Sequence, residues 1–195
     1  MTLYAVWNAA TYTITYSVNG GTGSAQRSSI DVSSDSYTTG GSAITLPDVG
    51  TLARTGYTFG GWTTTTTGAA LTGASTTAYT TAANVTLYAV WTAINYSVTY
   101  NVNSADTGTA PADGSNYNIG QNITVRGNTG TLARIGYTFA GWNTLADGSG
   151  NTYQSGSQYL VGSANVVLYA KWTANTYTVS YNINGGSGSA QRSSS

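Results

Sequence analysis

The sequence contains no cysteine, no histidine and no glutamate, and only one lysine stands among its 195 residues. The absence of cysteine excludes disulfide bonds as supports of the fold. Without histidine, cysteine and glutamate, the side chains that most often act as nucleophile, general base or metal ligand are missing. The six aspartates do not recur at equivalent positions of the repeats described below. We therefore expect no enzymatic activity, no catalytic residues, no metal site and no cofactor.

Charge of either sign is scarce, since six basic and six acidic residues cancel to a net charge of zero. The basic residues are scattered, whereas nucleic acid binding needs a cluster of them to neutralise phosphates. The same scatter argues against an anionic membrane surface. No apolar run approaches the roughly 18 residues that a membrane span requires. Met1 runs directly into a strand-like motif, so we expect it to be an added start on an excised piece rather than part of a signal peptide.

Aromatic and β-branched residues are plentiful instead, including 16 tyrosines and 5 tryptophans, together with 25 glycines. Threonine, tyrosine and valine favour strands, while glycine and asparagine favour tight turns. Residues that build helix surfaces are nearly absent. This composition predicts a mostly β protein rather than a disordered chain.

Three motifs recur with a period near 80 residues, which indicates tandem modules. Leu-Tyr-Ala-x-Trp starts at positions 3, 87 and 168, Tyr-x-[Val/Ile]-x-Tyr starts at 12, 96 and 177, and Gly-Thr-Leu-Ala-Arg starts at 50 and 130. The predicted segments are the last strand of a preceding partial repeat at 1–10, a first repeat at 11–93, a second repeat at 95–174, and the first strand of a following partial repeat at 176–195.

Alternation of apolar and polar residues predicts the strands within each module. Residues 12–18 place Tyr12, Ile14, Tyr16 and Val18 on one face, which is the pattern of a half-buried strand that ends at Asn19-Gly20-Gly21. Further strands are expected near 43–46, near 77–79, at 119–125, at 151–153 and at 158–161.

The segment Gly-Tyr-Thr-Phe-x-Gly-Trp, at 56–62 and 136–142, is predicted to be the centre of each module. Trp62 has the wrong parity to share a face with Tyr57 and Phe59 on a regular strand. We therefore expect a β-bulge at Gly60-Gly61 and at Ala140-Gly141 that turns each tryptophan back onto the aromatic face. The predicted structural core motif consists of Tyr57, Phe59, Gly61, Trp62, Leu87, Trp91, Tyr137, Phe139, Gly141, Trp142, Leu168 and Trp172.

At 134–143, 168–174 and 177–186 the chain resembles the Listeria–Bacteroides repeat family, also called the internalin B-repeat type. The resemblance implies a small β-grasp-like module of about four strands, found in tandem in large secreted or cell-wall proteins of bacteria. Such modules act as stalks or spacers, and some contribute to adhesion. The repeats here are longer than is usual in the family, with the extra length at 27–43 and around 112–128.

Together these features predict an elongated rod of tandem modules in an extracellular bacterial surface protein, acting as a stalk or fibre segment. Its partners would be neighbouring repeats, or identical chains joined head to tail, with each terminal strand completing the next chain. A host or cell-surface glycan or protein is the other partner class, and an adhesin or carbohydrate-binding module using exposed tyrosine and tryptophan is the alternative function. No nucleic acid partner is expected. The candidate assembly strands contain Leu3, Tyr4, Trp7, Tyr177, Val179 and Tyr181.

Three further features each allow two interpretations. Arg54 and Arg134 occupy the same slot of the two repeats, either as ligand contacts or as structural residues stacked on Tyr57 and Tyr137. The run 147–151 is interpreted as a glycine-rich turn rather than a calcium loop, since it offers a single carboxylate. An isopeptide crosslink at Lys171 is not favoured, because the chain has no glutamate to catalyse one.

Overall fold

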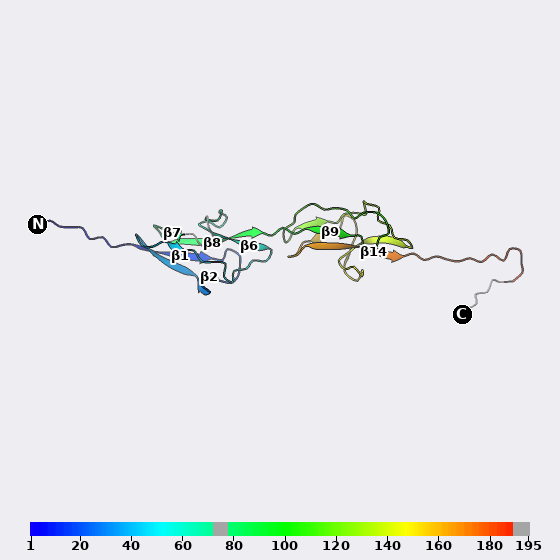
Figure 1. The fold of residues 1–195 in the computed structure, drawn as a ribbon, viewed down its shortest axis with the longest axis horizontal. Coiled ribbons are helices and arrows are strands. Elements are labelled where there is room, and N and C mark those ends of the chain that lie inside the picture. Colours follow the sequence, from blue (N-terminus) through cyan, green and yellow to red (C-terminus); the bar gives the residue numbers. More distant parts are fainter. Residues whose placement is uncertain (72–77, 189–195) are drawn as a thin grey trace. The chain divides into compact units, whose positions relative to one another are not determined.

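The computed structural model describes residues 1–71 and 78–188, and every regular element in these ranges is a β-strand (Figure 1). The prediction of a mostly β chain is therefore confirmed. No helix in the described ranges has the length and apolar character that crossing a membrane requires. The chain folds as two compact units, of which the first comprises Met1–Ser97, Ser115–Asn122 and Leu160–Asn165, and the second Val98–Gly114, Ile123–Tyr159 and Val166–Ser195.

The first unit is built on a four-stranded sheet in the order β4-β1-β8-β6. The strands are β1 (Thr11–Ser17), β4 (Ser34–Thr38), β6 (Tyr57–Thr63) and β8 (Val85–Ala93). The two central strands, β1 and β8, run parallel, and both outer strands pair antiparallel to them. Because β1 and β8 are far apart in sequence, their pairing closes the module by bringing its beginning and end together.

The second unit repeats this centre in a sheet of order β12-β11-β14-β9. Its strands are β9 (Val98–Asn101), β11 (Tyr137–Asn143), β12 (Thr152–Tyr153) and β14 (Val166–Ala174). Here β9 and β14 are the parallel pair, equivalent to β1 and β8. The edges differ, since β11 gains a neighbour in β12 while β9 has no described strand in the place that β4 takes beside β1.

Short strands complete the structure. In the first unit β2 (Ala25–Arg27) pairs antiparallel with β3 (Ile30–Val32), and β5 (Ile44–Thr45) pairs with β7 (Ala78–Tyr79). The second repeat adds β10 (Asn122–Thr124) and β13 (Gln158–Leu160). Strands thus occur in each of the expected regions, although Thr77 itself lies outside the described residues. The extra length at 27–43 holds β3 and β4.

One face of the first sheet carries the core of its unit. Ile14, Leu87 and Ala89 are completely buried, and Leu46 and Trp62 are nearly so. Along β1 the buried Ile14 stands between exposed threonines, as expected for a strand with one face on the core and one in water. The predicted half-buried strand is therefore confirmed.

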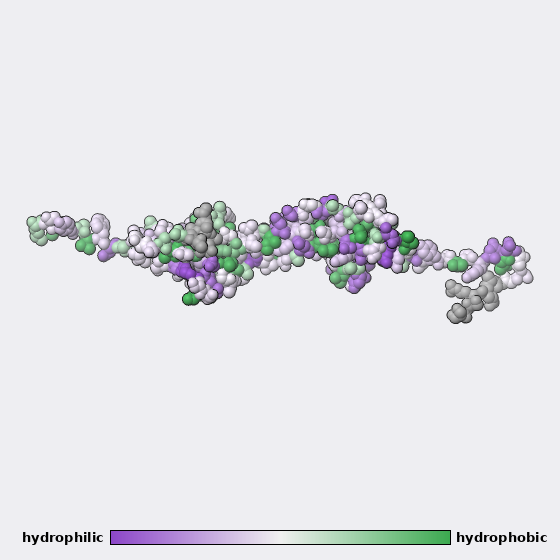
Figure 2. All heavy atoms as spheres, viewed as in Figure 1, coloured by the Kyte–Doolittle hydropathy of each residue, from purple (hydrophilic) through white to green (hydrophobic). Residues whose placement is uncertain are grey.

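The two terminal segments form no strand within their described residues, 1–10 and 175–188. Their apolar side chains lie open to solvent (Figure 2). The exposed fractions of the predicted assembly residues are 81% for Leu3, 85% for Tyr4, 89% for Trp7, 77% for Tyr177, 72% for Val179 and 64% for Tyr181. Their sequence equivalents in the complete modules include Leu87 and Ile14, which are buried.

Candidate functional site

The repeated aromatic motif contains a β-bulge in both units, at the predicted dipeptides. Opposite β8, Phe59 pairs with Trp91 and Gly61 with Val90, so one residue of β6 is left over. The register between β11 and β14 shifts in the same way between Phe139 and Trp142. Gly61 and Gly141 have φ angles of 115° and 111°, which only glycine adopts readily. The bulge corrects the parity of the strand and directs the tryptophan into the core.

Each buried tryptophan is the centre of a chain of aromatic rings. In the first unit the ring centroids of Trp62 lie 4.9 Å from Tyr16 and 5.5 Å from Phe59, and Phe59 lies 5.9 Å from Trp91. The second unit reproduces these contacts between Tyr100, Trp142, Phe139 and Trp172, at 4.7, 5.3 and 5.7 Å. Tilted and edge-on rings at these distances add stabilisation beyond area burial.

The indole N–H groups are also satisfied inside the module. Trp62 Nε1 donates to the carbonyl oxygen of Pro47 at 2.9 Å, and Trp142 Nε1 donates to that of Arg126 at 2.8 Å. With its ring packed and its N–H bonded, neither tryptophan presents a free polar group to a ligand. The aromatic motif is therefore used in building the module.

The other predicted motif residues divide into three groups by burial. Leu87 and Leu168 are completely buried, while Phe59, Phe139, Trp91 and Trp172 are half-buried beside the tryptophan. The tyrosines lie outside the core, since Tyr57 is half-buried and Tyr137 is 37% exposed. The guanidinium carbons of Arg54 and Arg134 stand over these two rings, 4.2 and 4.1 Å from the centroids. The structure thus places each arginine on its tyrosine, as the structural interpretation expected.

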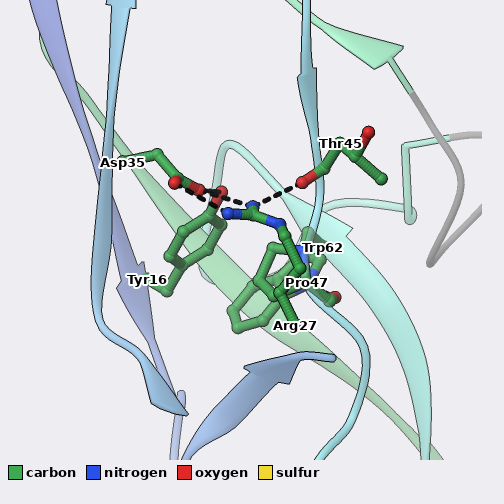
Figure 3. A network of polar contacts seen from close by, with 6 residues as sticks. All are labelled: Tyr16, Arg27, Asp35, Thr45, Pro47 and Trp62. Carbon is green, nitrogen blue, oxygen red and sulfur yellow. Dashed lines mark hydrogen bonds and ion pairs between the residues drawn. The ribbon is translucent and has the colours of Figure 1, made fainter. Parts of the chain in front are cut away.

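The first unit contains a cluster of polar side chains that the sequence did not predict (Figure 3). The Asp35 carboxylate accepts a hydrogen bond from the Tyr16 hydroxyl at 2.7 Å and two from the Arg27 guanidinium at 2.9 and 2.7 Å. Arg27 also donates to the carbonyl oxygen of Thr45. The cluster thereby joins β1, β2, β4 and β5, and its Tyr16 ring contacts Trp62.

The protonation of this cluster is fixed over the physiological range. Hydrogen bonds from Arg27 and Tyr16 hold the pKa of the Asp35 carboxyl below its ordinary value, in spite of partial burial. Burial and the neighbouring carboxylate raise the pKa of the Tyr16 hydroxyl far above its ordinary value. A general acid or base works best with a pKa near the operating pH, and neither group has one. The cluster is suited to clamping strands rather than to moving protons.

The second unit holds a counterpart made from different positions. Asp113, whose side chain is 2% exposed, lies 3.5 Å from Arg126. The backbone N–H of Arg126 donates to the hydroxyl of Tyr100, which occupies the slot of Tyr16. A tyrosine, an aspartate and an arginine thus gather beside the tryptophan in both units. Between the two complete repeats only the tyrosine recurs in the sequence, so their comparison could not reveal the charged pair.

Asp35→Asn is expected to lower the free energy of unfolding at pH 7 by about 2 kcal/mol, because it weakens charge-assisted hydrogen bonds to Arg27. Since the folded-state pKa of Asp35 is depressed, its stabilisation is present above its ordinary value of 3.8 and is lost as the pH falls through the lower folded value. Urea unfolding of wild type and variant at several pH values between 7 and 2 measures both effects.

The exposed Asp48 provides the matched control, since Asp48→Asn removes the same charge from a side chain outside the cluster. The wild type and Asp48→Asn should lose stability alike on acidification, and Asp35→Asn should lose less. Equal acid losses in all three proteins would contradict the assigned role of Asp35.

The run 147–151, weighed above as a calcium loop, and Lys171, weighed as a crosslink site, both make local contacts. Asp147 Oδ1 accepts hydrogen bonds from the backbone N–H and the hydroxyl of Ser149, at 2.9 and 2.7 Å, and these bonds lower its pKa. Within the described ranges no three residues of the types His, Cys, Asp and Glu are grouped to hold a metal ion. The Lys171 ammonium donates to the hydroxyl of Thr152 at 3.1 Å.

Comparison with known proteins agrees with this repeated architecture. The family model of the Listeria-Bacteroides repeat domain matches residues 12–90 and 96–171, which include most of the two four-stranded sheets. The chain belongs to the Listeria-Bacteroides repeat family. Each match runs from the first to the last strand of one parallel pair, from β1 into β8 and from β9 into β14.

Two relatives of the Listeria-Bacteroides repeats described here come from Evansella cellulosilytica. One, provisionally named a Gly-rich membrane protein, is 39% identical over 168 residues, covering 80% of this chain and 18% of that protein. The other, provisionally named a membrane protein, is 36% identical over 180 residues, covering 92% of this chain and 25% of that protein. The chain therefore spans a quarter or less of the length of these relatives. No solved structure matches it.

Proposed function

We propose that the chain is a structural stalk or fibre segment of a large extracellular bacterial surface protein. The observation that carries the proposal is that the residues that recur most strictly are used inside the modules. Both tryptophans are buried with their N–H groups bonded, and the rings around them pack on one another. A segment whose recurring aromatic motif builds the cores of its modules is suited to providing length. Membership of a repeat family and the large size of the relatives agree with this role.

The finer features of the proposal are a β-grasp-like module and a rod-like array. The first is supported by the parallel pair that the first and last strands of each sheet form. The second is supported by the short connection between modules, in which β8 ends at Ala93 and Tyr96 already pairs with Tyr117. Few freely rotating residues remain in such a connection, which restricts bending.

Pulling on single molecules tests the stalk function. We expect two separate unfolding events, because each module has its own core around its own tryptophan. Each event should release roughly 80 residues, which corresponds to roughly 280 Å of contour length at about 3.5 Å per residue. Small-angle scattering of the same protein measures its length. A single cooperative event together with the scattering of a compact globule would contradict an extended array of modules.

Head-to-tail association is a second proposal, favoured by the exposed apolar side chains of both terminal segments. In the complete module Tyr16 pairs with Leu87. The equivalent pair at a junction would be Tyr181 of one copy and Leu3 of the next. Neither terminal segment contains the Gly-Tyr-Thr-Phe-x-Gly-Trp strand, so the junction would lack the edge strand and the buried tryptophan. We therefore expect this contact to be weaker than the packing of a complete module and to need high protein concentration.

Deletion of residues 1–10 tests the junction, and of the first module it removes only the contact of Thr39 with the Ala10 carbonyl oxygen. Sedimentation and electron microscopy should show concentrated wild-type protein forming linear assemblies that the deleted protein does not form. Leu3→Asp, which puts a charge into the proposed apolar contact, should have the same effect as the deletion. Linear assemblies that persist in both variants would contradict the proposed contact.

A carbohydrate-binding or adhesive function remains the alternative proposal. Among the described residues, the tyrosine and tryptophan side chains that are more than 60% exposed belong to the terminal segments, namely Tyr4, Trp7, Tyr177 and Tyr181. A glycan array probed with the whole chain distinguishes the two functions, since a stalk should bind no neutral glycan above background.

A further inference from the structure

A small hollow recurs at the same place in both modules, beside the stacked arginine. In the first module it has a volume of about 140 Å³ and is lined by residues that include Asn19, Arg54, Thr63 and Trp91. In the second its volume is about 150 Å³, and Asn103, Arg134 and Trp172 take the equivalent places. An arginine, an asparagine and a tryptophan therefore form each hollow. Its recurrence in two modules of different loop sequence indicates a built feature.

The asparagine fixes the shape of the hollow. Asn19 Nδ2 donates to the carbonyl oxygens of Thr66 and Ala89, at 3.0 and 2.9 Å, and so ties the loop after β6 to β8. Asn103 Nδ2 makes the equivalent bonds to Ala146 and Ala170, both at 2.8 Å. Both asparagines have a φ of 46°, a left-handed conformation that asparagine tolerates better than most residues. These bonds fix the loop that forms one side of the hollow.

The indole N–H groups of the two tryptophans that line the hollows already donate hydrogen bonds within the protein. The indole N–H of Trp91 donates to the carbonyl oxygen of Val18 at 3.0 Å, and that of Trp172 donates to Asn103 at 2.9 Å. Each tryptophan therefore offers the hollow only its ring. The donors that remain for a ligand are the arginine guanidinium in both hollows, the lining threonine hydroxyls in the first, and the Lys171 ammonium in the second.

Each arginine is stacked on its tyrosine and has no acidic partner among the described residues. A tight turn returns the backbone from Arg54 to Tyr57, whose N–H donates to the Arg54 carbonyl at 3.0 Å, and Arg134 and Tyr137 are joined in the same way. In the described part of the chain, the ion pairs involve Arg27 and Arg126, and neither stacked guanidinium donates a hydrogen bond. Stacking occupies the face of the guanidinium and leaves its N–H edges available.

We propose that this hollow, formed around Arg54 and repeated around Arg134, binds one oxyanion, a carboxylate or a phosphate, carried on a small carbon framework. A guanidinium edge matches two oxygens of such a group bidentately, and the tryptophan ring offers an apolar wall for the attached carbons. One site per module, repeated along an array, would bind a polymer with many such groups far more tightly than a single group. This inference concerns ligand binding and does not depend on the stalk function.

The two sites differ in the charged side chains near the arginine. Within the described residues the lining of the first hollow contains no acidic side chain. The second is lined by Asp147 as well as Lys171, and the Asp106 carboxylate accepts a hydrogen bond from the N–H of Ile135, next to Arg134. The opposite charges of Lys171 and Asp147 offset each other, which leaves the Asp106 carboxylate to repel an incoming oxyanion. The site at Arg54 is therefore the tighter of the two.

The test is a titration of the full chain with polygalacturonate, which carries carboxylates, and in parallel with inorganic polyphosphate. Methyl-esterified polygalacturonate is the uncharged control. Binding is measured by calorimetry at low salt, and the arginine Nε–H signals are followed by NMR. We expect binding of at least one charged polymer, no binding of the ester, and shifts of the Arg54 and Arg134 signals but not of those of Arg27 and Arg126. The polymer that binds identifies the source of the oxyanion.

Variants locate the site. Arg54→Gln should weaken polymer binding at least tenfold, Arg134→Gln should weaken it less, and Arg54→Lys should fall between wild type and Arg54→Gln because it keeps the charge without the planar fork. Thermal unfolding verifies that each variant folds. The proposal is overturned if neither charged polymer binds, if the ester binds equally well, or if Arg54→Gln or Arg54→Lys binds as tightly as wild type.

Discussion

Trp142→Ala is expected to lower the free energy of unfolding by about 4 kcal/mol. The side chain is completely buried and contacts the rings of Tyr100 and Phe139 at centroid distances of 4.7 and 5.3 Å. Truncation leaves a large cavity and removes the N–H that satisfies the carbonyl oxygen of Arg126. Domains are commonly stable by only 5–15 kcal/mol, so this loss is a large part of what holds the module together.

Urea unfolding followed by circular dichroism measures the loss, and two controls separate its causes. Trp142→Phe keeps an aromatic ring but removes the indole N–H, so we expect about half of the effect. Trp172→Ala removes the same kind of side chain from a half-buried position and should cost less than Trp142→Ala. If Trp142→Ala costs under about 1 kcal/mol, or no more than Trp172→Ala, then Trp142 is not the centre of the core.

The position of this tryptophan could be derived from the sequence because two independent signals coincide there. Alternation places Tyr57 and Phe59 on one face and leaves Trp62 on the wrong one, and the adjacent pair of small residues identifies where the strand can bulge. The tryptophan at 137–142 has the same wrong parity relative to its tyrosine and phenylalanine, so the pattern is not accidental. The strand positions could also be predicted, because alternation of apolar and polar residues is a local property that each module displays separately.

The polar clusters could not be derived in this way. Arg27 and Asp35 are separated by β3, and only the pairing of β1 with β4 brings the carboxylate to Tyr16. The second unit uses Asp113 and Arg126 instead, so neither member of the charged pair recurs at a fixed offset between the two complete repeats. Tertiary contacts between residues that do not repeat leave no periodic trace in a single sequence.

Tyr57 and Tyr137 show a further limit of pattern reasoning. Parity correctly groups Tyr57 with Phe59, but parity does not say where the core ends along a strand. These tyrosines stand at the first residue of β6 and β11, beyond the ring chain, where each arginine covers them. The burial of a side chain depends on its distance from the core as well as on the face it occupies.

Gly141→Ala is expected to cost about 3 kcal/mol, because the bulge requires a backbone conformation that a side chain opposes. Gly141 has a φ of 111°, and an added Cβ would stand 2.8 Å from the carbonyl oxygen of Tyr153. A strained conformation of this kind costs on the order of 1–3 kcal/mol, and the close contact adds to it. If the strand instead relaxed the bulge, Trp142 would turn away from the core, at a similar or larger cost.

The neighbouring position supplies the matched control, since the two repeats already differ there. The slot of Ala140 is occupied by Gly60 in the first repeat, where an added Cβ would meet no atom closer than 3.3 Å. Gly60→Ala should therefore change the free energy of unfolding by less than about 1 kcal/mol, while Gly61→Ala, at a φ of 115°, should resemble Gly141→Ala. Urea unfolding of the four proteins, with the wild type as reference, measures the contrast. Equal effects of Gly60→Ala and Gly61→Ala would show that the dipeptide tolerates a side chain at either position, and the bulge would then not be what directs the tryptophan inward.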